Sequence, residues 1–256
     1  LRASFVNDQI AGTNLFDQVV DLINEILFHP LIDDNEFDGP TFRIQAHNLE
    51  QTITALYDDK QFYANRQLMN LYYPDDSIMR GPSFGQVADL AKLTAQNLVK
   101  VYQEMIERDR VDIFVLGDVD PAAVKDALGQ LPFIPRQAMD LQPFYRQPLY
   151  SAPKRQVEHQ PVVQAKLNLG YQLPVYYQDE NYYAGLVFNG LFGGTPYSKL
   201  FTNVREKASL AYYATSRLLP FTGFLGIQTG IQAADAQKVE DLIAQHLADI
   251  CAGKFS

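Results

Sequence analysis

The side chains best suited to chemistry lie in residues 189–213, which read as a helix, a glycine break, a second helix, a turn and a strand. The break is Gly193-Gly194, the second helix ends in a charged run around Arg205, and Tyr212 lies early in the strand. Such a turn brings the Arg205 guanidinium and the Tyr212 hydroxyl to the same end of the layer. Both groups donate hydrogen bonds, so together they could hold a peptide carbonyl. From the residues alone, a second interpretation stays open, in which Arg205 is a helix-end cation favoured by the helix dipole and Tyr212 is a rim residue of the sheet.

Strands and helices alternate around this stretch. The apolar alternation over residues 163–171 is typical of a half-buried strand, and the segment from Pro220 to Gly223 indicates a hairpin. The other expected elements of this half are helices over residues 181–191, 197–206 and 235–250 and strands over residues 210–219 and 223–231. This order predicts an α+β fold, with helices packed on a mainly antiparallel sheet. No Gly-Lys-Ser/Thr sequence follows Gly193 and Gly194, so we interpret them as a packing break and not as a phosphate loop.

The first half has mostly helical periodicity. We expect a short strand from Leu1 to Phe5, helices over residues 14–29, 42–58, 61–71 and 87–106, a buried strand over residues 111–117 and a helix from Pro121. Thr94 is expected to cap the second part of the 87–106 helix pair, and the residues before Pro121 cap the last helix. Because both halves contain helices, then a strand, then a capped helix, we predict two related domains.

The pattern breaks down between residues 132 and 161, where prolines recur among polar residues. Such a composition is typical of an extended, semi-rigid linker. We therefore divide the chain into residues 1–131, the C-terminal part of a first domain; residues 132–161, the linker; and residues 162–256, a second domain truncated at its C-terminus. Because the chain begins at Leu1 without Met and stops just after a helix, we expect it to be a fragment.

Composition excludes several classes of protein. The chain has 256 residues and a formal net charge of -9, which argues against nucleic acid or an anionic membrane surface as partner. Cys251 is its one cysteine, so an internal disulfide framework and a cysteine-based zinc finger are excluded. No apolar run approaches the roughly 20 residues that span a bilayer. We expect a cytoplasmic protein of bacterial type, with no membrane partner.

The run from Arg205 to Tyr212 resembles the pattern R-E-x-x-x-L-A-Y of the insulinase/pitrilysin-like zinc peptidases, the inverzincins. The preceding Leu191-Phe192-Gly193-Gly194 and Ser198-Lys199-Leu200-Phe201 agree with it, and the order of elements agrees over essentially the whole chain. The likeness is to the short-chain group that includes mitochondrial processing peptidase. It implies two related domains of the LuxS/processing-peptidase-like metallopeptidase fold. It also implies that Arg205 and Tyr212 bind substrate, because the matching residues of active members hold the substrate carbonyl and the developing oxyanion.

The resemblance implies a zinc site that this chain does not complete. The family holds zinc with H-x-x-E-H on one helix and a distant Glu, and a second Glu acts as base. The nearest match begins at His47 and has Gln51 where the second His should be. The distant carboxylate falls near Thr52, or with a shifted register at Glu50, which is the one weak metal candidate. No catalytic residue is expected, and zinc is expected in the full-length protein or its partner. The remaining histidines form no spaced pair and are interpreted as structural or surface residues: His29, His159 and His246.

These features predict a non-catalytic member of the family that binds peptide or scaffolds a zinc-bearing sister subunit, as a homodimer or a heterodimer. Two alternatives remain open. One is an active zinc endopeptidase whose H-x-x-E-H lies upstream, with Glu50 as third ligand. The other is a purely structural subunit that keeps the fold without hydrolysis.

Overall fold

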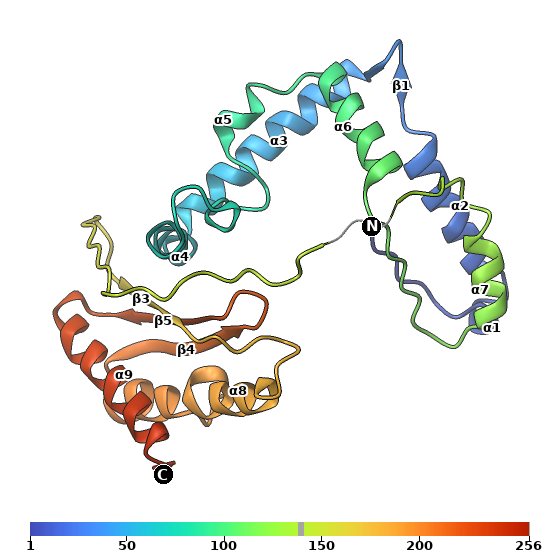
Figure 1. Ribbon diagram of the computed structural model, residues 1–256. Helices are drawn as coiled ribbons and strands as arrows, with labels where there is room; N and C mark the ends of the chain where they lie inside the picture. The colour runs from blue at the N-terminus through green and yellow to red at the C-terminus, as the bar shows by residue number, and fades with distance from the viewer. Residues whose placement is uncertain (138–140, 256) are drawn as a thin grey trace. The chain divides into compact units, whose positions relative to one another are not determined.

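The computed structural model describes residues 1–137 and 141–255, which form two compact units (Figure 1). Unit 1 comprises Leu1–Thr52 and Gln86–Leu141, and unit 2 comprises Ile53–Gly85 and Gln142–Ser256. Unit 1 contains α1 (Asp8–Ala11), α2 (Leu15–Phe28), β1 (Ile32–Asp33), β2 (Glu36–Phe37), most of α3 (Gly39–Asp58), α5 (Val87–Leu90), α6 (Ala95–Arg108) and α7 (Pro121–Leu128). Unit 2 contains α4 (Lys60–Tyr72), η1 (Ile78–Arg80), β3 (Ala165–Gln172), α8 (Tyr182–Asn189), η2 (Gly190–Gly194), η3 (Leu200–Lys207), β4 (Ala211–Leu219), β5 (Phe224–Ile231), η4 (Ala233–Asp235) and α9 (Ala236–Cys251). None of the described helices is both long enough and apolar enough to cross a membrane.

Unit 2 is built on an antiparallel sheet with the strand order β3-β5-β4. The central strand β5 pairs with β3 through Leu169 opposite Ile227, and with β4 through Ser216 opposite the same Ile227. The hairpin between β4 and β5 closes at Gly223, whose φ of 59° lies in the left-handed region that glycine adopts at little cost. The predicted α+β fold with an antiparallel sheet is confirmed.

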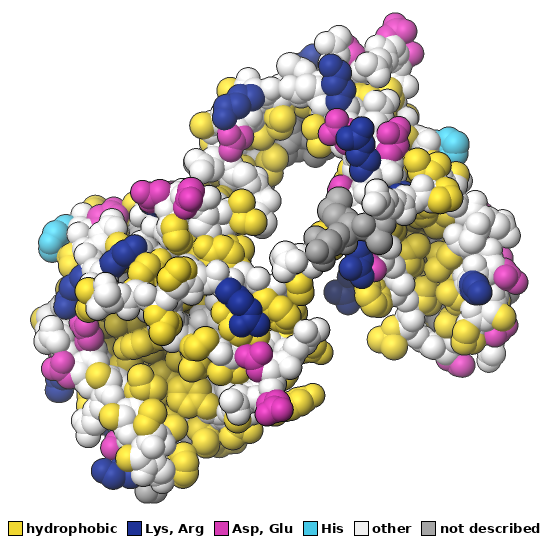
Figure 2. Space-filling view, in the orientation of Figure 1, with side chains coloured by type: hydrophobic (Ala, Val, Ile, Leu, Met, Phe, Trp, Pro, Cys, Tyr) yellow, Lys and Arg dark blue, Asp and Glu magenta, His cyan; other side chains and the backbone are white. Residues whose placement is uncertain are grey.

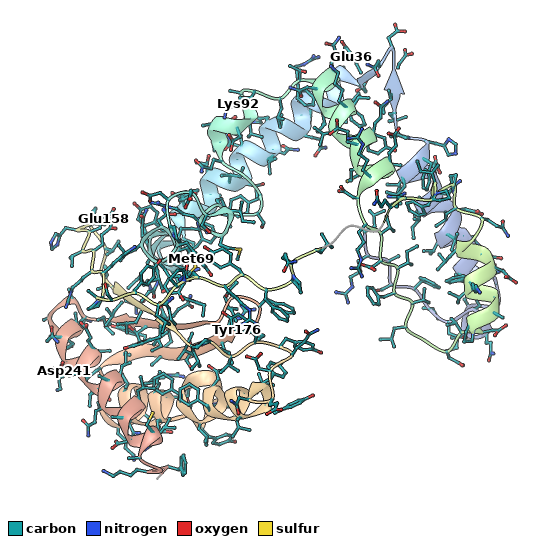
Figure 3. The ribbon with its side chains drawn as sticks, viewed as in Figure 1. Glu36, Met69, Lys92, Glu158, Tyr176 and Asp241 are labelled. Atoms are coloured by element: carbon teal, nitrogen blue, oxygen red, sulfur yellow. The ribbon has the colours of Figure 1, made fainter. Side chains whose placement is uncertain are left out.

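The two faces of this sheet are covered by different helices (Figure 1). Consecutive residues of a strand point to opposite faces, and β5 shows this at Phe224 and Leu225. Phe224 joins a cluster with α4 residues, including Met69, which is labelled in Figure 3. Leu225 joins the main core on the other face, whose buried members include Phe192, Leu200, Val204, Ile227, Val239 and Ile243. Each fully buried side chain of this size contributes about 1.5–3 kcal/mol.

Polar contacts also fix α4 to the sheet. Gln228 of β5 donates from Nε2 to Oδ1 of Asn65 over 3.3 Å, and the Tyr213 hydroxyl of β4 donates to Oε1 of Gln61. Burial, with the nearby Asp59 carboxylate, raises the pKa of Tyr213 to about 12, so its hydroxyl stays protonated at neutral pH. These bonds join residues far apart in the sequence.

Unit 1 has a much smaller interior. Its buried apolar side chains among the described residues are Val20, Val99 and Leu131. Figure 2 shows yellow apolar atoms on the surfaces of both units. Local signals nevertheless act as expected here, because Thr94 forms a capping box with Asn97 and Asp120 caps α7 with Pro121 at its first turn.

Two predicted strands are wrong. The structure has no strand over Leu1–Phe5 or over residues 111–117. In the second segment Phe114 is 91% exposed and Leu116 is fully exposed, where burial was expected. A strand needs a neighbour that accepts its backbone hydrogen bonds, and no segment of the described chain pairs with either. Both segments have the apolar pattern of a strand, but this pattern does not provide a neighbouring strand.

The proline-rich range, residues 132–161, lacks regular secondary structure but is not a free linker. No helix or strand forms in its described part, as expected, yet the part from Gln142 onward belongs to unit 2. The backbone N–H of Tyr145 donates to the carbonyl of Phe221 over 2.8 Å, and that of Tyr150 donates to Oε1 of Gln172 over 2.7 Å. The two compact units do not coincide with the predicted division at residues 131 and 161, which stays a prediction about domains.

Candidate functional site

Arg205 lies at the exposed side of η3. This π-helical segment buries Leu200 and Val204 in the core of unit 2, and Arg205, the next residue, turns outward with its side chain 41% exposed. Its guanidinium carbon lies 4.5 Å from the ring centroid of Phe201, and its Nε lies 3.5 Å from Oε1 of Glu206. The contact with the Phe201 ring restricts the side chain, whose partly exposed guanidinium keeps several N–H donors.

A tight turn connects η3 to β4. The N–H of Ala208 donates to the carbonyl of Asn203 over 3.0 Å, and that of Leu210 donates to the carbonyl of Val204 over 3.1 Å. Between them Ser209 has a φ of 51°, in the left-handed region. This confirms the predicted turn between the charged helix end and the strand.

Tyr212 is the extra residue of a β-bulge. Ala211 pairs with Ile231 and Tyr213 pairs with Gly230, so Tyr212 has no partner in the ladder. Bulges re-aim a side chain and occur at sheet edges and next to active sites. The Tyr212 side chain is accordingly 60% exposed.

The Tyr212 hydroxyl accepts one weak hydrogen bond, from Nε2 of Gln232 over 3.4 Å. Its own proton therefore remains available to an external acceptor. Arg205 and Tyr212 both lie on the surface of unit 2 at the two ends of the same turn. We call this region, with Phe201 and Gln232, the Arg205–Tyr212 surface. Convergence of the two side chains on one peptide carbonyl stays a prediction.

Gly193 acts in packing, in agreement with the prediction that the glycine pair is a packing break. A Cβ at this position would lie 2.6 Å from the backbone nitrogen of Ser216 and 2.9 Å from Cδ1 of Leu200. The absence of a side chain lets η2 approach β4, and the Ser216 hydroxyl bonds to Oδ1 of Asn189 over 2.9 Å. This contact fixes the helical layer against the strand that carries Tyr212.

The residues nearest to a zinc motif do not fit a zinc ion. Nδ1 of His47 lies 3.8 Å from Oε2 of Glu50, both on the exposed surface of α3, with Gln51 where a second histidine is needed. The Thr52 hydroxyl donates to the carbonyl of Asn48 within the helix over 2.8 Å. Zinc takes three or four nitrogen, sulfur or carboxylate ligands, and this helix brings two. In the part of the chain that the structure describes, no three His, Cys, Asp or Glu side chains gather as a metal site.

His246 has an environment that its sequence position did not reveal. It is 8% exposed, on the core side of α9, and neither ring nitrogen has a hydrogen-bond partner among the residues that the structure describes. Burial, with the ammonium groups of Lys199 and Lys207, lowers the pKa of His246, and Asp249 opposes this shift. Its Nδ1 lies 3.8 Å from Oδ2 of Asp249, beyond hydrogen-bond distance. The imidazole is therefore neutral in the folded protein at neutral pH.

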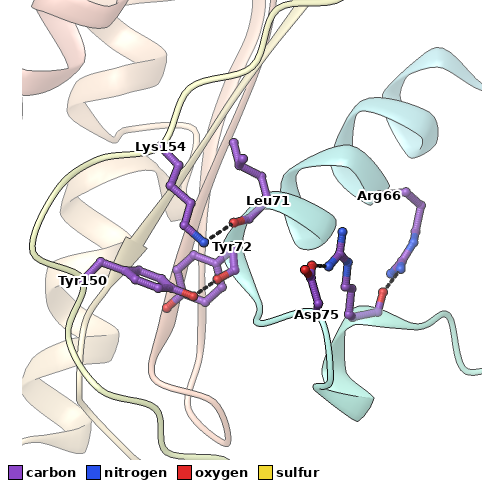
Figure 4. A network of polar contacts seen from close by, with 7 residues as sticks. Arg66, Leu71, Tyr72, Asp75, Tyr150 and Lys154 are labelled. Atoms are coloured by element: carbon purple, nitrogen blue, oxygen red, sulfur yellow. Dashed lines mark hydrogen bonds and ion pairs between the residues drawn. The ribbon is translucent and has the colours of Figure 1, made fainter.

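A polar network at the end of α4 was not predicted (Figure 4). Nζ of Lys154 donates to the carbonyl of Leu71 over 3.2 Å, and the Tyr150 hydroxyl donates to the carbonyl of Tyr72. Lys154 also lies 4.6 Å above the Tyr150 ring. These two linker residues satisfy the last carbonyls of the helix. The spacing of Tyr150 and Lys154 within the proline-rich range was the one available signal.

Comparison with known proteins places the fold and the family. The family described as "Peptidase M16 inactive domain" matches residues 92–256. A curated relative named "Probable inactive metalloprotease YmfF" from Bacillus subtilis (strain 168) is 34% identical over 252 residues, which cover 98% of this chain and 58% of the relative. A second, "Uncharacterized zinc protease YmxG" from the same organism, is 25% identical over 90% of this chain and 54% of its own length. The chain thus spans a little over half the length of these relatives.

Solved structures agree. A conserved protein from Enterococcus faecalis V583 superposes with a TM-score of 0.89 at 42% identity, over 98% of this chain and 60% of that one. The peptidase M16 inactive domain from Pseudomonas fluorescens shares the fold with a TM-score of 0.69 at 20% identity, over 91% of this chain and 56% of that one. The resemblance carried by the Arg205–Tyr212 motif is confirmed: the chain belongs to the peptidase M16 family, and its match is to the inactive domain of that family.

Proposed function

We propose that this chain is a non-catalytic M16 homologue that binds an extended polypeptide at the Arg205–Tyr212 surface, in partnership with a zinc-bearing homologous subunit. The observation that carries the proposal is the bulge at Tyr212. It leaves the phenol 60% exposed in a strand whose neighbour Ala211 is buried. An exposed phenol at a bulge, with an exposed arginine at the other end of the preceding turn, is more readily explained by a ligand than by packing.

The sheet offers a second element of recognition. β4 is an edge strand among the described strands, because it pairs on one side with β5. An edge strand presents unpaired N–H and C=O groups to which an extended peptide can add as a further strand. Tyr212 lies at the start of that edge. A peptide bound there would place a carbonyl near the hydroxyl and guanidinium donors.

The chemistry available at this surface is binding and not hydrolysis. A guanidinium and a neutral phenol donate hydrogen bonds and stabilise a carbonyl or an oxyanion. They do not activate water, which in this family's chemistry is the task of zinc and a general base. The helix α3 brings together two side chains of zinc-ligand type, His47 and Glu50, where zinc needs at least three. This shortfall and the name of the YmfF relative both support a non-catalytic role.

A peptide-binding measurement tests the proposal. Arg205→Ala and Tyr212→Phe are compared with wild type by fluorescence anisotropy of a labelled, extended peptide of about a dozen residues. A hydrogen bond contributes about 0.5–1.5 kcal/mol, and one to a charged group about 1.5–3 kcal/mol. We expect Kd to rise roughly threefold to tenfold for Tyr212→Phe and more for Arg205→Ala.

Matched controls are available in the same unit. Arg155→Ala removes an arginine that lies outside β4 and pairs with Glu240, and Tyr197→Phe removes the hydroxyl of a tyrosine that is 93% exposed. Neither change should alter Kd. Unaltered affinity in the Arg205→Ala, Tyr212→Phe double variant would refute the assignment of this surface. Absence of peptide binding by the folded wild-type chain would instead favour a purely structural subunit.

The non-catalytic part of the proposal has its own test. The purified chain is analysed for metal by native mass spectrometry after incubation with zinc, and for cleavage of the same peptide. We expect neither zinc at one ion per chain nor cleavage. Zinc bound in that ratio together with cleavage by the chain alone would refute this part.

The second candidate function is an active zinc endopeptidase, which the printed name of the YmxG relative favours. In this case Glu50 supplies the third ligand to histidines on a segment outside these 256 residues. Measured on a longer protein that includes such a segment, Glu50→Gln would abolish zinc binding without unfolding the chain. His29→Gln, at the residue that follows α2, is a control that should leave zinc content unchanged.

A further inference from the structure

Unit 2 contains a polar cavity that is separate from the Arg205–Tyr212 surface. Its volume is about 590 Å³, and it opens at the C-terminal end of α4. The polar lining side chains come from α4, the segment after it and the proline-rich segment: Gln67, Asn70, Tyr73, Asp75, Arg80, Lys154 and Gln156. We propose that this cavity binds the C-terminal end of a short peptide, with the peptide carboxylate on Lys154.

The charge in the cavity favours one anionic group. Asp75 forms an ion pair with Nη1 of Arg80, so these two charges offset one another. Lys154 has no carboxylate partner among the described residues, and its one hydrogen bond is to the carbonyl of Leu71. An ammonium has three N–H donors, so two remain available. The cavity therefore has one unmatched positive charge.

The rest of the lining suits peptide groups. The side chains of Asn70 and Gln156 take part in no hydrogen bond with other described residues, and each primary amide donates and accepts. Peptide N–H and C=O groups are their natural partners. A C-terminal carboxylate is a recurrent recognition element for proteins that bind peptide ends. The volume accommodates a few residues, since ligand cavities of about 300–1,000 Å³ bury small molecules of this size.

A structural role for Lys154 accounts for part of its placement. The ammonium caps the last turn of α4 together with the Tyr150 hydroxyl, and it lies over the Tyr150 ring (Figure 4). This cap uses one of the three donors and fixes the position of the others. A purely structural lysine predicts loss of stability on substitution, and no discrimination between ligands.

The experiment uses the full chain and two probes, N-acetyl-Ala-Ala-Ala with a free carboxylate and the same tripeptide as its C-terminal amide. Binding is measured by chemical-shift perturbation of the backbone amides of residues 67–80 and 154–156. We expect the acid to bind at least about tenfold more tightly than the amide. Equal binding of the two probes, or binding of neither, would overturn the proposal.

Variants separate binding from folding. Lys154→Met should remove the difference between acid and amide, and Lys154→Arg should retain it because the charge and donors remain. Arg155→Met is the matched control, because the adjacent Arg155 pairs with Glu240, 3.3 Å away. If Arg155→Met abolishes the acid preference as fully as Lys154→Met, the assignment to Lys154 is wrong. The Arg205→Ala, Tyr212→Phe variant should bind both probes as wild type does, so the two proposals fail independently.

Discussion

Substitution of Gly193 by alanine tests how closely η2 approaches the sheet. The added Cβ would lie 2.6 Å from the Ser216 backbone nitrogen and 2.7 Å from its Oγ, closer than two such atoms approach in proteins. Because one of these atoms belongs to the backbone of β4, a rotamer change cannot relieve the contact. The layer of η2 and η3 must therefore move away from the sheet.

The expected cost follows from overpacking in a closed core, which is about 1–3 kcal/mol. With an m value of about 2 kcal/mol per M for urea, the unfolding midpoint of unit 2 should fall by roughly 0.5–1.5 M. Hydrogen exchange followed by mass spectrometry on peptides from β4 and β5 reports on unit 2 alone. We expect faster exchange over both strands in Gly193→Ala.

Gly190 provides the matched control in the same helical turn. Its nearest contact for an added Cβ is Cγ2 of Thr195 at 3.8 Å, an ordinary van der Waals distance. Gly190→Ala should be neutral or stabilise by up to about 1 kcal/mol, because alanine is the better helix former. If both variants shift the midpoint alike, or if Gly193→Ala is as stable as wild type, the close approach of η2 to β4 is refuted.

Three further predictions concern stability and solubility. The lowered pKa of His246 means that its protonation opposes folding, so the free energy of unfolding should fall as pH drops below the ordinary pKa value of 6.5. The Tm of His246→Phe should therefore depend less on acid pH than that of wild type. The control His159→Gln, at an exposed position, should keep the acid dependence of wild type. Thr94→Ala should cost about 1 kcal/mol through loss of the cap of α6, measured by hydrogen exchange in that helix, whereas Thr52→Ala should change little. Leu116→Lys should leave the melting temperature unchanged and raise solubility, measured by precipitation with ammonium sulfate, because Leu116 is fully exposed; a lower melting temperature would show that Leu116 is buried.

Sequence reasoning succeeded where the determinants are local. The caps at Thr94 and Asp120 begin helices at the expected positions, because a side-chain oxygen accepts from the first turn whatever the rest of the fold does. The alternation of β3 and the turn before β4 are equally local. The R-E-x-x-x-L-A-Y motif identified the family because its residues form a contiguous helix end, turn and strand.

The features that were not predicted depend on residues far away in the sequence. The apolar run over residues 111–117 has the composition of a central strand, but periodicity does not state whether a neighbouring strand is present. His246 could not be recognised as buried from α9 alone, since its surroundings include groups from distant parts of the sequence, such as the Lys199 ammonium. The position of Tyr212 in a bulge likewise depends on its register with β5.

Unit 2 is built from two separate stretches of the sequence, so its parts leave the ribosome at different times. The helix α4 bonds to strands through Gln61–Tyr213 and Asn65–Gln228, pairs that lie 152 and 163 residues apart. At about 5–20 residues per second, α4 leaves the ribosome roughly 8–33 seconds before its partners on β4 and β5 exist. During that interval the cluster that contains Met69 and Tyr72 lacks Phe224 of β5, so part of its apolar surface stays open to chaperones that bind nascent chains.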